Sequence, residues 1–293
     1  MQLGAHMSIA GGVHLALERA AEIQMTACQI FTKNDRQWVA KPLDPDNIRR
    51  FREQREALGF NRAAIISHAS YLINLASPDD LLWHKSMEAF QDELERCRLL
   101  DVPYLVVHPG AHVGSGTEVG VRRVAAALDA IHHALPDNQT MTLLETTAGQ
   151  GTTLGASFDE IAAIMAITRD QELVGVCLDT CHVFAAGYDL REPEGYATTM
   201  ESFDRSIGLE RLRAIHVNDS KHPAGSRKDR HQHIGQGEIG LEGFRSVVND
   251  PRLRSVPALL ETEKGDNGEH DVRNLATLRG LIGHATPEVA PTS

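Results

Sequence analysis

Several features that would place this chain of 293 residues in a specialised class are missing. It has no apolar run of about 20 residues, the length that a membrane-spanning helix needs, so we expect no membrane contact. Its first residues contain neither the basic nor the apolar segment of a secretory signal, so a cytoplasmic location is the default expectation. Its four cysteines form no C-x-x-C pair, and we expect them to be reduced thiols in the core.

Boundaries between domains are also missing. No segment rich in proline, glycine or serine, and no change in composition, divides the chain before its C-terminal tail. The tail, residues 284–293, contains Pro287 and Pro291 and no apolar period, so we expect it to be frayed. One domain over residues 1–283 is the simplest prediction.

Acidic residues and histidines are abundant instead. The net charge is −11, which argues against binding nucleic acid by simple charge attraction. The 15 histidines point elsewhere, because histidine is the commonest metal ligand among side chains that titrate near neutrality. Many acids together with many histidines suggest a metal site, whose cations would offset part of the negative charge locally.

Short strand-like runs alternate with helical runs along the chain. We expect strands over residues 2–6, 27–31, 63–67, 104–107, 141–144, 174–178, 212–217 and 258–260. We expect helices over residues 13–24, 45–58, 78–100, 117–134, 158–167, 196–207, 241–248 and 272–282. This strict alternation predicts a parallel sheet, and eight such units fit a single-domain (β/α)₈ TIM barrel of the α/β class. A doubly wound sheet is the alternative, although no G-x-G-x-x-G follows the first strand.

Metal-ligating residue types mark the carboxyl ends of six consecutive expected strands. They are His68, His108, Glu145, Asp179, His216 and Glu261. In a barrel these ends converge on one face, where the active sites of this fold lie. Any one of them alone is equally well explained as a buried polar group with an ordinary hydrogen-bond partner. Six together are different, because burying this many carboxylates without cations would be very costly.

Three more candidate ligands occur in expected loops. They are His182, Asp229 and His231. The last two flank an arginine in a D-R-H sequence, which lets two side chains approach one ion. The loop over residues 221–233 also carries Arg227, Lys228 and Arg230. A basic cluster in an acidic protein suits contact with phosphate, although a solvated loop would explain it too.

The nine candidates are too many for one zinc ion, which takes about four ligands. They suit a cluster in which some carboxylates bridge. Nitrogen and oxygen donors without cysteine favour zinc or manganese. Clusters of several metal ions are typical of phosphoryl chemistry, where they activate water and stabilise the attacking and leaving oxygens.

Five long motifs surround these candidates. They are FTKN at residues 31–34, HASYLINL at 68–75, ETTAGQG at 145–151, DTCHVFAAGYD at 179–189 and DRH at 229–231. With them the chain closely resembles the endonuclease IV family of abasic-site endonucleases. The resemblance runs nearly end to end, from residues 4–6 to residues 260–262.

The resemblance implies a (β/α)₈ barrel that holds three zinc ions. The first ion would be held by His68, His108 and Glu145. Glu145 would bridge to the second ion, whose other ligands would be Asp179, His216 and Glu261. The third ion would be held by His182, Asp229 and His231.

The resemblance also implies a reaction and a partner. Members of the family cleave 5′ to an abasic site, leave a 3′-hydroxyl and a 5′-deoxyribose phosphate, and trim blocked 3′ ends. The expected partner is therefore double-stranded DNA with either lesion, bound by a monomer. Glu145 and Glu261 would be catalytic as ligands that place the attacking water. A proton-transfer role for Glu261 is an open alternative.

Recognition of the lesion would use the loops after the second and third strands. In the family these loops insert into the duplex, and the matching residues here are Arg36, Tyr71 and Leu72. Without the resemblance, surface packing would explain all three. Asp35 and Thr146 depart from the family, which commonly has a neutral glutamine and an asparagine there. Neither departure removes a ligand, so they bear on substrate range and salt tolerance.

Two other functions compete with the nuclease. A sugar isomerase or epimerase of the xylose-isomerase-like type would use the four ligands from Glu145 to Glu261, but would leave His68, His108 and the D-R-H pair unexplained. A non-catalytic metal-binding or DNA-scaffold protein is the other alternative. Activity on a duplex with one abasic site would distinguish it from an enzyme.

Overall fold

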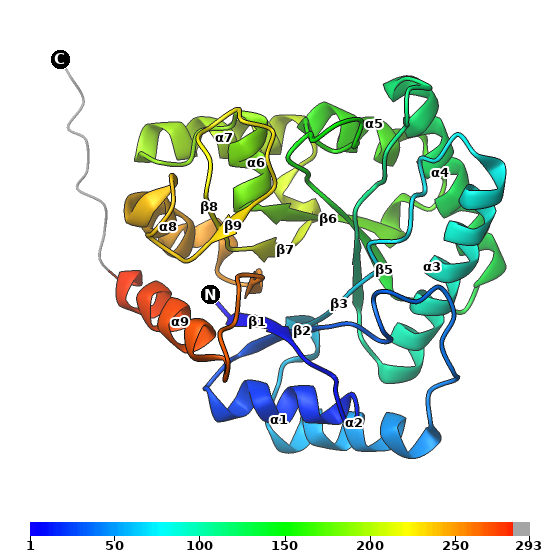
Figure 1. The fold of residues 1–293 in the computed structure, drawn as a ribbon, viewed down its shortest axis with the longest axis horizontal. Coiled ribbons are helices and arrows are strands. Elements are labelled where there is room, and N and C mark those ends of the chain that lie inside the picture. Colours follow the sequence, from blue (N-terminus) through cyan, green and yellow to red (C-terminus); the bar gives the residue numbers. More distant parts are fainter. Residues whose placement is uncertain (284–293) are drawn as a thin grey trace.

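Eight short strands close into a parallel barrel in the computed structural model, which describes residues 1–283 (Figure 1). The strands are β1 (Leu3–Met7), β2 (Ala27–Ile30), β3 (Ile65–His68), β4 (Tyr104–Val107), β5 (Met141–Glu145), β6 (Val174–Asp179), β7 (Leu212–His216) and β10 (Ala258–Leu260). Pairing follows chain order, and β10 closes the ring against β1. The predicted barrel is confirmed and the doubly wound sheet is excluded. The tail expected to be frayed lies outside the described residues.

Helices surround the barrel. They are α1 (His14–Glu22), α2 (Pro45–Ala57), α3 (Asp80–Leu100), α4 (Thr117–Ala134), α5 (Phe158–Ile167), α6 (Thr180–Ala186), α7 (Pro193–Ser206), α8 (Gly240–Asn249) and α9 (Glu269–Leu281). Several begin as their sequences dictate, since the side chains of Asp44, Asp79 and Ser157 cap the first turns of α2, α3 and α5. Among the described residues, none of these helices combines the length and apolar character needed to cross a membrane.

Two apolar cores hold the layers together. The larger core lies between the strands and the surrounding helices. The smaller core fills the inside of the barrel with residues of the strands and, at Ala64, of the turn before β3: Ala27, Ala64, Ile66, Val106, Leu143, Cys177, Ala214 and Leu259. On β1 the corresponding position is Gly4, where an added Cβ would lie 1.9 Å from the carbonyl oxygen of Ala27. The barrel closes tightly there because Gly4 has no side chain.

Two short elements depart from strict alternation. Helix α6 follows β6 directly, because Asp179 accepts a hydrogen bond from the His182 amide at 2.9 Å and so caps a new helix. Residues 219–232 form a small hairpin in which β8 (Asp219–Ser220) pairs antiparallel with β9 (His231–Gln232). The expectation that His182 and His231 lie in loops is therefore wrong: one is helical and the other lies in a strand.

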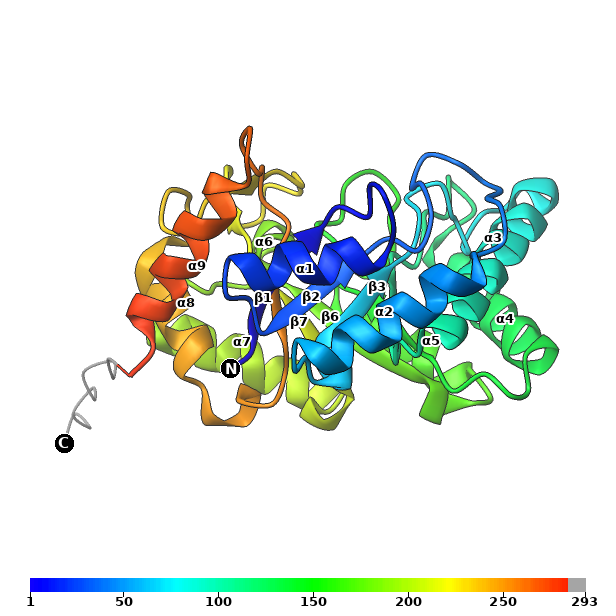
Figure 2. The same cartoon turned by 90° about the horizontal axis from the view of Figure 1, so that it is seen from below.

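The loops that follow the strands gather on one side of the molecule. Figure 2 shows the connections after β1, β2 and β10 rising from the same side of the barrel. The hairpin of β8 and β9 lies at the rim of that side, in the connection after β7. This is the side on which the sequence predicts the functional site.

Candidate metal centre

The predicted strand-end ligands point into the barrel because side chains alternate along a strand. Each follows a residue of the interior core by two positions: Ile66 and His68, Val106 and His108, Leu143 and Glu145, Cys177 and Asp179, Ala214 and His216, Leu259 and Glu261. The apolar core therefore forms a floor, and the six polar side chains form a layer above it. The structure brings all six together, as the sequence predicts.

The nine candidates form three groups in which the possible ligand atoms lie within 4.8 Å of one another. The first group is His68, His108 and Glu145. The second is Glu145, Asp179, His216 and Glu261. The third is His182, Asp229 and His231. These groups are the same sets that the family resemblance assigns to three ions.

Glu145 belongs to two groups, and its two oxygens face different ways. Oε2 lies 3.0 Å from Nε2 of His68 and 2.9 Å from Nε2 of His108. Oε1 lies 2.9 Å from Nδ1 of His216, on the side of the second group. The carboxylate is fully buried. It therefore has the geometry of a bridging ligand.

Hydrogen bonds at the back of the histidine rings fix which nitrogen faces the centre. Nδ1 of His68 donates to the carbonyl oxygen of Ala69 at 2.7 Å, and Nδ1 of His182 donates to that of Thr146 at 2.8 Å. A carbonyl oxygen only accepts, so each Nδ1 carries a proton, and each Nε2 is the nitrogen that faces the carboxylates of the ligand groups. This arrangement is typical of metal-bound histidine.

The other two oriented rings follow the same rule. Nε2 of His216 donates to Oε1 of Gln29 at 2.8 Å, which leaves Nδ1 facing the carboxylates. Nδ1 of His231 lies 3.3 Å from the carbonyl oxygen of Glu261. In the described residues, Nε2 of His182 and Nε2 of His231 are buried and have no hydrogen-bond partner. Such unpaired nitrogens beside Asp229 fit an ion in the third group.

The carboxyl groups are held in their charged form. Burial acts to raise the pKa of Glu145, but the nearby His108 and His216 outweigh it and hold this pKa well below its ordinary range. Burial also acts to raise the pKa of Glu261, but the nearby His216 outweighs it, and this pKa falls to about 2. Burial acts to lower the pKa values of His68, His182 and His216, but the neighbouring acidic groups outweigh it and raise all three, so binding a metal would displace protons from these rings.

Two buried amides near the centre escaped the sequence analysis. Gln29 donates to Oε1 of Glu261 at 2.6 Å, and Asn218 donates to Oδ2 of Asp179 at 2.7 Å. Gln29 follows Ala27 of the interior core by two positions, so the alternation rule also places it in the polar layer. Asn218 follows His216 by two positions in the same way. That spacing was the available signal.

The mouth of the centre holds Tyr71 and an open cavity. The Tyr71 side chain is 58% exposed, yet its ring centroid lies 5.1 Å from that of His68 and 5.8 Å from that of His108. Arg36 is exposed and Leu72 is half-buried in the adjoining loops. A cavity of about 210 Å³ opens beside the first and third groups, with Arg230 in its lining. A cationic side chain therefore borders the predicted metal groups.

Asp179, Cys181 and His231 form a further trio that shares two members with these groups, and a separate trio, His233, Glu263 and His270, also brings possible ligand atoms together. The hydrogen bonds of this separate trio do not favour a metal ion. Oδ1 of Asn274 accepts from the backbone amide of Ile234 at 3.2 Å, so Nδ2 of Asn274 donates to Nδ1 of His233 at 3.1 Å. Nε2 of His233 must then carry the proton and has no lone pair for an ion.

Comparisons with known proteins show which similarities identify the family of this chain and which concern only its fold. The chain matches the family described as "Xylose isomerase-like TIM barrel" over residues 17–279. It is 51% identical over 281 residues to "Probable endonuclease 4" of Chloroflexus aurantiacus, which covers 96% of this chain and 98% of that protein. The crystal structure of endonuclease IV from Thermus thermophilus matches with a TM-score of 0.86 and 39% identity, covering 97% and 100% of the two chains.

A D-tagatose 3-epimerase-like protein shares the architecture as well. It covers 96% of this chain and 98% of its own, with a TM-score of 0.70 but only 21% identity. At that identity the likeness concerns the fold alone, whereas the endonuclease matches are much closer and equally long. This chain therefore belongs to the endonuclease IV family of abasic-site endonucleases, which are hydrolases.

Proposed function

We propose that this protein hydrolyses the phosphodiester bond on the 5′ side of an abasic site in double-stranded DNA. The products would be a 3′-hydroxyl and a 5′-deoxyribose phosphate, and the same centre would trim blocked 3′ ends. The observation that carries the proposal is the position of Glu145, whose two oxygens face two ligand groups beside a third. Family membership supports the substrate class.

Three zinc ions suit the proposed donors, with manganese as an alternative at one or more sites. The nine side chains offer only imidazole nitrogens and carboxylate oxygens. When bound, such ions activate water and stabilise the attacking and leaving oxygens of phosphoryl transfer. The unpaired, buried Nε2 atoms of His182 and His231 support an ion beside Asp229.

The chain's own residues would orient this centre and shield it. Thr146, which stands where the family commonly has asparagine, accepts a hydrogen bond through Oγ1 from the Asp179 amide at 3.0 Å. Gln29 and Asn218 fix the carboxylates of Glu261 and Asp179. Ligands whose rotamers are held by such contacts are preorganised for binding. Glu145 and Glu261 would place the attacking water, as the resemblance implies.

A sugar isomerase would need only the group of Glu145, Asp179, His216 and Glu261. That function gives no role to the histidines of the other two groups, although backbone hydrogen bonds orient the rings of His68 and His182 as well. Metal counting on the purified protein separates the two functions. One ion per chain favours the isomerase, and three favour the nuclease.

The direct test is incision of a duplex that contains one abasic site. We expect 5′ incision without added magnesium and slow loss of activity to a strong chelator, because the ligands are largely buried. The measurement is product analysis on a sequencing gel, combined with metal content. An intact duplex is the control. Full activity in metal-stripped protein would contradict the proposed mechanism.

The exposed residues at the mouth give a second prediction. Tyr71→Ala or Arg36→Ala should weaken the preference for abasic over intact duplex by about tenfold, since stacking of an aromatic ring on a base is worth a few kcal/mol at most. Bound metal should not change, because neither side chain belongs to a ligand group. Competition binding with the two duplexes measures the preference.

Matched variants sharpen this test. Tyr71→Phe keeps the ring and should keep the preference. Arg50→Ala removes an exposed arginine from α2, outside the mouth, and controls for the loss of one positive charge. An unchanged preference in both Tyr71→Ala and Arg36→Ala would remove these residues from lesion recognition.

A further inference from the structure

A buried charged network lies beneath the two loops that carry Arg36 and Tyr71. We call residues 31–44 the β2 loop and residues 69–79 the β3 loop. Nζ of Lys33, from the β2 loop, lies 3.1 Å from Oδ2 of Asp92 and 3.4 Å from Oε1 of Glu93, both on α3. The side chains of Lys33 and Glu93 are only 2% and 1% exposed. None of these three residues belongs to the proposed metal centre.

Lys33 connects two parts of the β2 loop to each other and also connects the loop to α3. Its amine also donates to the carbonyl oxygen of Trp38 at 3.3 Å, further along the same loop, and to that of Ala89 at 3.4 Å on α3. Arg96, likewise buried, donates to the carbonyl oxygens of Thr32 and Lys41. The loop that presents Arg36 is therefore held at several points along its length.

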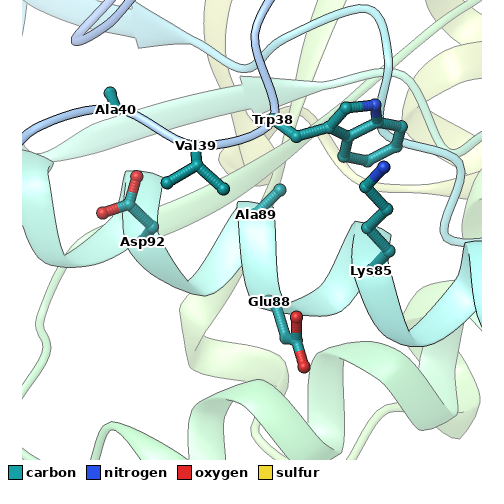
Figure 3. A pocket seen from close by; sticks show the side chains of 7 residues that line it. All are labelled: Trp38, Val39, Ala40, Lys85, Glu88, Ala89 and Asp92. Atoms are coloured by element: carbon teal, nitrogen blue, oxygen red, sulfur yellow. The ribbon is translucent and has the colours of Figure 1, made fainter.

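The outer part of this attachment is visible in Figure 3. Trp38 and Val39 of the β2 loop face the side chains of α3 across a cavity of about 270 Å³. Nζ of Lys85 lies 4.4 Å from the centroid of the Trp38 ring, within the range of a cation–π contact. The contact is at the surface, whereas the Lys33 network lies beneath it.

Glu93 extends the same network to the β3 loop. Its Oε1 accepts from the backbone amide of Ser70 at 3.2 Å. The Ser70 hydroxyl then donates to the carbonyl oxygen of Asp35 at 2.5 Å and accepts from the Leu72 amide at 3.2 Å. Asp35 precedes Arg36, and Ser70 precedes Tyr71. One continuous path of hydrogen bonds thus connects the residues adjacent to both recognition side chains.

Stability alone does not account for this buried pair. Removing two charges from water offsets much of their attraction, and a well-packed neutral pair is often as stable. A fully bonded buried network does fix a unique geometry. Lesion recognition requires such a geometry, since the two loops must enter one duplex together.

We propose that Lys33 and Glu93 are positioning residues that hold the β2 and β3 loops in a fixed position relative to each other for lesion recognition. The expected effect on incision of abasic DNA rests on the proposed function. The structural content of the inference, the coupling of the two loops through α3, stands on the contacts above.

The test uses a neutral double variant, Lys33→Met with Glu93→Gln. Methionine keeps the aliphatic stem, and glutamine keeps the shape of Glu93 but replaces its charge-assisted hydrogen bond to the Ser70 amide with a weaker neutral one. The matched control is Glu95→Gln, which removes an exposed carboxylate of α3 that pairs with Arg98. Both proteins are prepared with their metal. The measurements are hydrogen exchange in the two loops, melting temperature, and KM and kcat on an abasic duplex.

We expect faster exchange in both loops and a KM raised about tenfold, with kcat and melting temperature close to wild type. Glu95→Gln should match wild type throughout. Unchanged exchange in either loop overturns the coupling, and an unchanged KM or a loss confined to kcat overturns the role in recognition. If the wild-type protein does not incise abasic DNA, the proposed function fails, and loop exchange alone decides the coupling.

Discussion

Glu145→Ala is expected to lower abasic-site incision by more than about 1,000-fold, a larger loss than that of one electrostatic contact. Each oxygen of Glu145 faces a different ligand group, so one substitution removes a donor from two groups at once. We also expect fewer ions per chain than in the wild type. Metal analysis of the purified variant and single-turnover incision measure the two effects.

The control for this experiment is Glu263→Ala. Glu263 is an exposed carboxylate of the trio in which His233 offers no lone pair, and we expect near-normal metal content and incision from this variant. If Glu145→Ala instead keeps its full complement of ions and cleaves within tenfold of wild type, the bridging assignment is wrong.

His231→Ala is expected to remove one ion, keep about two, and slow incision by roughly 3 kcal/mol, the scale of a lost stabiliser of developing charge. The third group depends on the short hairpin of β8 and β9 at the barrel rim. The first two groups depend on the strands of the closed barrel, which should stay in place. Circular dichroism should therefore show an intact fold.

The comparison that decides this prediction is His222→Ala. His222 lies in the same hairpin and belongs to none of the three groups, so the variant should retain three ions and its activity. Near-normal incision by His231→Ala contradicts a role for the third ion. Loss of every ion contradicts the separation of the third group from the other two.

The sequence predicted the barrel and its polar layer well because both follow from local rules. Alternating strands and helices lead to a parallel barrel, and a ligand at the end of each strand must face the same mouth. His68 and His216, far apart in the chain, meet for that reason: their ring centroids lie 5.9 Å apart.

The parts that were missed depend on contacts between distant segments or on a second role for one residue. Helix α6 begins because Asp179 caps it, although the sequence predicts only a ligand role for Asp179. The pairing of Ser220 with His231 requires an intervening loop to fold back, which no local pattern predicts. Gln29 has a signal in its spacing, but a single polar residue in an apolar strand does not reveal its partner.

Because the oxygens of Glu145 face two ligand groups, ions bound in these groups would not load independently. The first ion would fix the carboxylate and draw electron density from it, and this changes the affinity of the second group for its ion. Thermodynamic linkage makes the effect reciprocal: the second ion alters the affinity for the first by the same factor. A metal titration of the apoprotein should then require a coupling constant between these two groups, in addition to the binding constants of the three groups.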